Sequence, residues 1–169
     1  MSEQSIVSDT SLLLYLGRIG KLDVVPLLYR EVCVSVKVVQ ELDAGRLLRG
    51  DTIDPRVLDW ITVVPVSQED IDVLPSNQLG IGEQSVITYA KIHAGYVAGL
   101  DDRLARLFAE QLGINVVGMI GVLLKAKRAG LISSLCPVLE SARNQGFRMS
   151  KELYQEALLL AGEEAKVGI

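Results

Sequence analysis

The chain has 169 residues, of which 49% are hydrophobic and 22% are charged, and its formal net charge is −4. This composition is typical of a globular protein and excludes the disordered and collagen-like classes. The net negative charge argues against a strong overall attraction to nucleic acid. The length suits one domain that buries about two thirds of its extended surface. We expect a single domain over residues 1–169, with a helical extension from about residue 133.

Signals for secretion or membrane insertion are missing from the sequence. No basic segment precedes an apolar stretch at the start, and no uninterrupted apolar run is long enough to span a bilayer. The two cysteines, Cys33 and Cys136, are not spaced like metal ligands or a disulfide scaffold. We therefore expect a cytoplasmic protein that does not act at a membrane.

Apolar, strand-like runs alternate along the chain with segments of helical periodicity. Strands are expected over residues 6–9, 32–36, 60–66, 96–100 and 114–117. Helices are expected over residues 12–16, 21–29, 37–48, a short stretch from 67, 83–94, 103–112, 120–129, 135–145 and 150–161. Pro65 favours an edge position for the third strand. This alternation predicts an α/β fold, a three-layer α/β/α sandwich with a mostly parallel central sheet.

The first expected strand ends in a carboxylate, Asp9, which Thr10, Ser11 and an apolar helix follow. Open α/β sheets present groups to ligands at the carboxyl ends of their strands. Asp is also a good helix N-cap. Asp9 is therefore either a cap or a ligand-binding group, and the positions of other acids decide between the two interpretations.

Further carboxylates fall where the hydrophobic pattern calls for apolar residues, or where a strand ends. Glu41 lies on the apolar stripe of helix 37–48, Glu83 begins the stripe of helix 83–94, and Asp101 and Asp102 follow the fourth strand. A carboxylate that faces the core is costly unless it is hydrogen-bonded, paired or bound to a metal. Each position also has a simpler explanation. The helix dipole favours Glu83, Glu41 could reach solvent at the edge of its stripe, and one of the two aspartates caps the next helix.

We expect these acidic positions to converge with Asp9 at the carboxyl edge of the sheet. Carboxylates that share a small volume need a compensating charge, and hard oxygen ligands select Mg²⁺ or Mn²⁺. An ion held in this way activates water and stabilises phosphate oxygens during phosphodiester cleavage. Asp9 is then a ligand, and capping is left to Thr10 or Ser11. The single histidine, His93, argues against a Ser-His-Asp triad.

At these residues the sequence resembles PIN-domain proteins, in a branch described only as an uncharacterised family. The similar stretches cover nearly the whole chain: 6–14, 38–42, 82–87, 100–106, 117–127 and 146–150. The resemblance implies an α/β/α sandwich with a divalent-metal ribonuclease site. Many relatives are toxins of bacterial or archaeal toxin–antitoxin pairs, often dimeric and silenced by a small antitoxin protein.

By that resemblance Asp9 is a direct metal ligand, Glu41 and Glu83 are the second and third acids, and Asp101 is the fourth. The sequence departs from the wider superfamily at two of these positions. Glu83 stands where Asp is common, and Gly99-Leu100-Asp101-Asp102 replaces the usual Thr/Ser-x-Asp. Either Asp101 or Asp102 can therefore take the fourth role, and the hydrophobic residues that follow favour Asp101.

The leading hypothesis is an Mg²⁺- or Mn²⁺-dependent endoribonuclease, the toxin of a toxin–antitoxin pair, with RNA, a small antitoxin and a second copy of the chain as partners. Residues 103–151 contain eight Lys or Arg against two acids, a balance that suits a polyanion or simply solvated helix faces. The residues expected to hold the RNA backbone are Arg103, Arg106, Lys125, Lys127 and Arg128.

Two other readings remain open. The alternative to a nuclease is a catalytically inactive PIN-like module that binds RNA or a protein. A metal-dependent phosphatase on another α/β scaffold is weakened by the absence of a paired Asp-x-Asp after the first strand.

Overall fold

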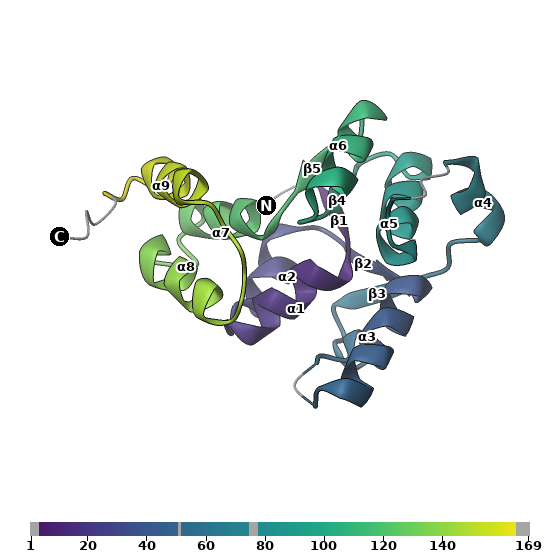
Figure 1. The fold of residues 1–169 in the computed structure, drawn as a ribbon, viewed down its shortest axis with the longest axis horizontal. Coiled ribbons are helices and arrows are strands. Elements are labelled where there is room, and N and C mark those ends of the chain that lie inside the picture. Colours follow the sequence, from purple (N-terminus) through teal and green to yellow (C-terminus); the bar gives the residue numbers. More distant parts are fainter. Residues whose placement is uncertain (1–3, 51, 75–77, 165–169) are drawn as a thin grey trace.

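The structure, a computed structural model, describes residues 4–50, 52–74 and 78–164 (Figure 1). Within these residues the strands form one sheet in the order β3-β2-β1-β4-β5. The strands are β1 (Ser5–Ser8), β2 (Val32–Ser35), β3 (Ile61–Val64), β4 (Tyr96–Gly99) and β5 (Val116–Val117). Each neighbouring pair is parallel. The carboxyl ends of the strands therefore share one edge of the sheet.

Helices cover both faces of this sheet, as Figure 1 shows. They are α1 (Thr10–Arg18), α2 (Val25–Leu28), α3 (Val36–Leu48), α4 (Gln68–Val73), α5 (Ile81–Ile92), α6 (Arg103–Gln111), α7 (Met119–Arg128), α8 (Leu135–Asn144) and α9 (Lys151–Leu160), with 3-10 turns η1 (Leu22–Val24) and η2 (Pro55–Val57). Helix α5 packs on β1, β2 and β4, whereas α7 packs against α1 and α2. The predicted three-layer α/β/α fold is confirmed.

The central strands are buried along their whole length because helices cover them on both sides. Strand β3 lies at an edge of the sheet and ends just before Pro65, which confirms the expected edge position. The strand order reverses between β1 and β4. In open α/β sheets this switch point is where ligands bind, and the residues that follow β1 and β4 here are Asp9 and Asp101.

Several elements differ in length from the sequence expectation. The helix expected over 21–29 is divided into η1 and the single turn of α2, which has Pro26 near its start. Strand β5 has two residues in place of four. Helix α5 begins at Ile81, ahead of the expected Glu83.

The chain ends in a helical hairpin that lies beyond α7 (Figure 1). Helices α8 and α9 follow residue 133 as expected and pack on each other and on α7. Gly146, between them, has a φ of +94°, which few other residues adopt. The proposed domain ends, 1–3 and 165–169, lie outside the described residues, so the single-domain boundary stays a prediction.

Cys33 and Cys136 are both free thiols. Among the helices that the structure describes, none is long and apolar enough to cross a membrane.

Candidate functional site

Asp9 lies directly after β1 and only 3% of its surface is exposed. Its backbone N–H donates to the Gly99 carbonyl at 2.9 Å, which keeps the ends of β1 and β4 together. Its side chain caps α1, because Leu12 N–H donates to Asp9 Oδ1 at 2.9 Å. The expectation that Thr10 or Ser11 would cap this helix is wrong. A short Asp side chain on extended backbone reaches the third N–H of the helix, and the second carboxylate oxygen is not needed for this bond.

Asp101 and Asp102 follow β4 and take different roles. Asp102 is exposed and caps α6 by accepting a hydrogen bond from Ala105 N–H at 2.9 Å, which confirms that one of the pair is a cap. Asp101 turns toward the start of α7, where Met119 N–H donates to its Oδ1 at 2.8 Å. Oδ2 of Asp101 is buried and has no hydrogen-bond partner. The geometry therefore favours Asp101 over Asp102 as the functional acid.

Glu41 points from α3 toward the starts of α1 and α5. Thr10 Oγ1 donates to Glu41 Oε2 at 2.6 Å, and Gly82 N–H donates to Oε1 at 3.0 Å. The contact with α5 depends on the missing side chain of Gly82, since a Cβ there would lie 2.6 Å from both carboxylate oxygens. Glu41 is half-buried, and its carboxylate is held by α1 and α5 while part of the side chain stays exposed.

Glu83 lies in the first turn of α5, where the helix dipole favours a negative charge. Gly80 N–H donates to its Oε2 at 3.2 Å. Asp9, Glu41, Glu83 and Asp101 thus share one feature: each accepts a backbone N–H at the beginning of a helix. The positive ends of α1, α5 and α7 consequently face the same edge of the sheet. We call these four residues the acidic edge.

The charges at the acidic edge disfavour one another. Burial raises the pKa of Asp9 to about 8, the Leu12 N–H opposes this shift, and the charges of Asp101 and Glu83 add to it. Burial also raises the pKa of Asp101, whereas the hydrogen bond from Met119 N–H and the charge of Arg106 lower it. The pKa of Glu83 is raised by burial and by the charges of Asp102 and Glu41. The charge interactions therefore link Asp9 to Asp101 and Glu83, and Glu83 to Glu41 and Asp102.

The acids do not, as they stand, enclose a metal ion. Within residues 4–50, 52–74 and 78–164, no three His, Cys, Asp or Glu side chains are grouped tightly enough to hold one. Their metal-binding and catalytic roles stay predictions.

Two of the predicted RNA-binding residues lie next to the acidic edge. Arg103 is exposed in the first turn of α6, directly after the Asp102 cap. Arg106 lies beside Asp101: a Cβ on Gly118 would come within 2.8 Å of both Arg106 Nη1 and Asp101 Oδ1. These arginines can approach a phosphate bound at the acidic edge.

The structure does not bring Lys125, Lys127 and Arg128 to the acidic edge. They follow Met119 by six to nine positions on α7, which places them roughly 9–14 Å further along the helix axis. Lys125 Nζ donates to the Gln4 side chain, ahead of β1 and thus at the opposite end of the sheet. Lys127 donates to Ser133 O and Glu163, within the helical hairpin region.

Sequence reasoning missed the residues that position the acids. Thr10 was expected only as a cap, yet it holds Glu41. Gly82 and Gly118 leave room for Glu41 and for Asp101 with Arg106. A glycine in the first turn of a helix, where it lowers helix stability, is a signal of close approach that was available at Gly82.

A comparison with protein families agrees with this geometry. A family model described as DUF3368: PIN domain matches residues 5–163. A comparison with curated proteins found no match. PIN domains have a nuclease-type fold, are generally nucleases and typically use divalent metal ions. Because the match spans all the described strands and helices, the chain belongs to the PIN-domain family.

Proposed function

We propose that the chain is a divalent-metal-dependent endoribonuclease that hydrolyses phosphodiester bonds at the acidic edge. The observation that carries this proposal is the pair of carboxylates at the switch point of the sheet, one buried and one half-buried. Asp9 is 3% exposed and its pKa is about 8, while Asp101 keeps a buried Oδ2 without a partner. Neighbouring carboxylates in such a place destabilise the fold unless a cation offsets them.

The donor set suits Mg²⁺ or Mn²⁺. The acidic edge offers carboxylate oxygens without a His or Cys ligand in it, and hard oxygen ligands select these ions. Asp9 and Asp101 would hold the ion, with Glu41 and Glu83 completing the set. When bound, the ion offsets the carboxylate charges, lowers the pKa of water and stabilises charge on phosphate oxygens.

The other residues of the site hold this arrangement. Thr10 and Gly82 fix the Glu41 carboxylate, and Met119 N–H fixes that of Asp101. Burial and the charges of Asp102 and Glu41 raise the pKa of Glu83, the direction that favours proton acceptance by a carboxylate. Arg106 and Arg103 supply positive charge for the phosphates of the RNA.

The biological role is proposed from the sequence resemblance alone. We propose a cytoplasmic toxin of a toxin–antitoxin pair that is a homodimer and is silenced by a small antitoxin protein. The neighbouring reading frame tests this role: a small protein that copurifies with the chain and suppresses its activity supports it. The mass of the purified chain in solution tests the homodimer.

One observation favours the second candidate, a catalytically inactive module that binds RNA or protein. Each acid already has a backbone hydrogen bond, and no three of the described acids are gathered around a common point. A purely structural role for these carboxylates predicts no stabilisation by Mn²⁺, whereas a metal site predicts a higher melting temperature.

The nuclease proposal is tested by comparing Asp→Asn substitutions at two neighbouring positions, 101 and 102. Asp101→Asn removes a proposed ligand, whereas Asp102→Asn keeps the α6 cap because Asn also caps well. With Mn²⁺ and single-stranded RNA, we expect Asp101→Asn to lower the cleavage rate by about 100-fold or more and Asp102→Asn to change it far less. Equal rates in wild type and Asp101→Asn would contradict the proposal.

A further inference from the structure

A pocket of about 290 Å³ between α1 and α3 begins at the acidic edge. The hydrogen-bonded pair Thr10 and Glu41 forms that end of it. The lining continues at four-residue spacing, with Thr10, Leu14 and Arg18 along one face of α1, Glu41 and Gly45 on α3, and Arg49 in extended backbone directly after α3. Two turns of α1 separate Thr10 from Arg18, a distance of about 12 Å along the helix axis.

The chemistry of the pocket changes along this length. Its middle is apolar, with Leu14 and Leu42 as lining and no side chain at Gly45, and Leu48 adds apolar surface toward the far end. Its far end has two guanidinium groups, and Arg18 is positioned over the Tyr15 ring, 5.4 Å from the centroid. The carboxylate end suits a metal-bound phosphate, the apolar middle suits a flat base, and the cationic end suits a further phosphate.

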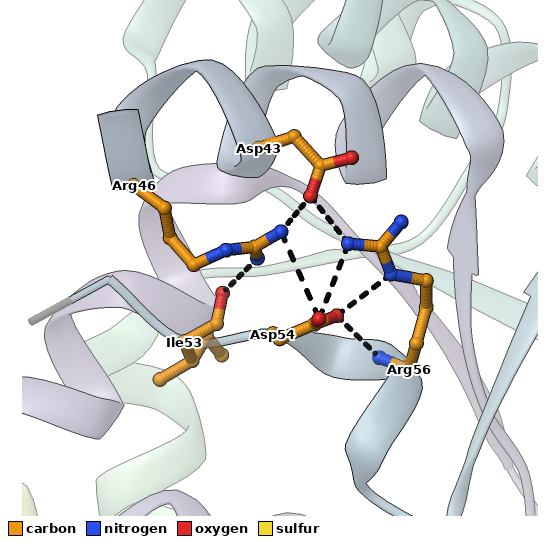
Figure 2. A network of polar contacts seen from close by, with 5 residues as sticks. All are labelled: Asp43, Arg46, Ile53, Asp54 and Arg56. Atoms are coloured by element: carbon orange, nitrogen blue, oxygen red, sulfur yellow. Dashed lines mark hydrogen bonds and ion pairs between the residues drawn. The ribbon is translucent and has the colours of Figure 1, made fainter. Parts of the chain in front are cut away.

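An ion-pair network holds the third side of the pocket against α3. Figure 2 shows its members: Asp43, Arg46, Ile53, Asp54 and Arg56. Asp43 accepts hydrogen bonds from Arg46 and, at 2.6 Å, from Arg56. Asp54 accepts from Arg56 Nε at 2.9 Å and lies 3.7 Å from Arg46. The network ties the segment around η2 to the exposed side of α3.

The same network reaches α1 through the backbone. Arg46 Nη1 donates to the Ile53 carbonyl at 3.1 Å, and a Cβ on Gly17 of α1 would lie 3.1 Å from Ile53 Cγ2. Thr52, the neighbour of Ile53, is buried and lines the pocket opposite Gly45. The pocket therefore has three sides held in place within the free chain.

We propose that this groove binds the single-stranded RNA segment next to the cleaved bond, with one unpaired base in the apolar middle and a phosphate at Arg18 and Arg49. This inference rests on the proposed function. The length of about 12 Å exceeds the rise of about 3.4 Å per nucleotide in a helical strand, so the groove is long enough for one splayed base with a phosphate on either side. The volume, at the lower limit of the roughly 300–1,000 Å³ of small-molecule sites, suits one base. Recognition of a splayed base requires an unpaired strand.

Binding of a short fluorescent single-stranded RNA to the full chain in EDTA tests the groove without cleavage. We expect Arg49→Ala to weaken binding about five- to tenfold and to reduce the slope of log K against log salt by about 0.7. Arg30→Ala is the matched control, because Arg30 is exposed just before β2, at the opposite end of the sheet, and should change neither quantity.

A second pair of variants tests the apolar middle. Gly45→Leu places a side chain in the groove and should weaken binding about fivefold. Gly45→Ala should bind like the wild type, because its Cβ makes only ordinary contacts with Thr52, at 3.6 Å. Both changes raise the helix propensity of position 45, and a thermal melt of each variant shows that a loss of binding is not a loss of folding.

Cleavage of the same RNA with Mn²⁺ separates this inference from the proposed function. If cleavage depends on Asp101 while Arg49→Ala and Gly45→Leu bind RNA like the wild type, RNA binding by the groove is disproved and the nuclease proposal is retained. If the variants show that RNA binds in the groove but the RNA is never cleaved, the nuclease proposal is disproved and the groove proposal is retained. Absence of RNA binding by the wild type overturns the groove.

Discussion

Two groups of carboxylates in this molecule have opposite electrostatics. At the acidic edge the pKa values of Asp9, Glu83 and Asp101 are all raised. In the network of Figure 2, hydrogen bonds from Arg56 hold the pKa of Asp54 below its usual range, and Arg46 adds to this effect. The chain thus places two arginines where they link a surface segment to α3, whereas at the acidic edge Arg106 beside Asp101 does not offset the effect of burial on that carboxylate. This difference supports the proposal that the acidic edge receives a cation from outside.

The largest expected effect comes from making the same substitution in both groups. Asp9→Asn keeps the α1 cap, since Asn also accepts the Leu12 N–H, but removes a proposed metal ligand and should lower RNA cleavage by about 100-fold or more. Asp54→Asn should lower the melting temperature, because it weakens the pairing with Arg46 and Arg56, and should reduce cleavage far less than Asp9→Asn, because Asp54 belongs to the wall of the groove and not to the acidic edge. Cleavage assays and thermal melts of both variants check the contrast, and a fully active Asp9→Asn would break it.

The pH dependence of stability gives the next effect, measured without divalent ions. The pKa of Asp9 is raised in the folded state from 3.8 to about 8, so folding favours its protonated form. Its contribution is fully present below about pH 4 and is lost as the pH rises through 8, a loss on the order of a few kcal/mol. Denaturant unfolding between pH 4 and 9 checks this, and Asp9→Asn should flatten the curve. If the free energy of unfolding of Asp9→Asn fell with pH as steeply as that of the wild type, the pH dependence would come from other groups.

Gly82→Ala should weaken metal binding at little cost to stability. The new Cβ would displace the Glu41 carboxylate, which lies 2.6 Å from its position at the end of a flexible side chain. We expect the affinity for Mn²⁺ to fall about tenfold, in the range for residues that orient metal ligands. Gly80→Ala is the matched control, since its Cβ would lie 3.8 Å from Glu83 Oε2. Calorimetric titration of both variants measures the difference; equal affinities would contradict a role for Glu41.

The smallest effect concerns a satisfied carboxylate far from the acidic edge. Partial burial raises the pKa of Glu163, but hydrogen bonds from the Leu135 and Cys136 N–H groups, Lys127 and Ser134 lower it to about 2. Its stabilisation is present above its ordinary pKa of 4.5 and is lost as the pH falls toward 2. Glu163→Gln should remove this acid-side loss and leave the Asp9 slope intact in the same unfolding experiment. If Glu163→Gln lost stability below pH 4.5 as the wild type does, the acid-side loss would not come from Glu163.

The alternation of elements and the acids at strand ends could be predicted from the sequence because both follow from local patterns. The parallel sheet places whatever follows β1 and β4 at one edge, so Asp9 and Asp101 meet there whatever the details of their side chains. Helical periodicity likewise marked Glu41 as facing inward.

The parts that could not be predicted depend on distances between segments. Whether Lys127 lies near Asp101 depends on the direction of α7, which carries it away from the acidic edge to Glu163. The pairing of Asp43 with Arg56 crosses a loop, and no local pattern encodes it. The prediction treated helix capping and metal binding by Asp9 as mutually exclusive. A carboxylate has two oxygens, so one can cap the helix while the other remains available.

The central claim is that the acidic edge binds a divalent cation, and thermal unfolding with increasing Mn²⁺ tests it most directly. At 100 times the dissociation constant, binding to the folded state contributes about 2.7 kcal/mol, which for a chain of this size raises the melting temperature by roughly 5–10 °C. The increase should be larger at pH 8 than at pH 6, because the ion competes with protons for Asp9, and it should be absent from the Asp9→Asn, Asp101→Asn double variant. A wild type that Mn²⁺ does not stabilise, or a double variant stabilised equally, would contradict the account.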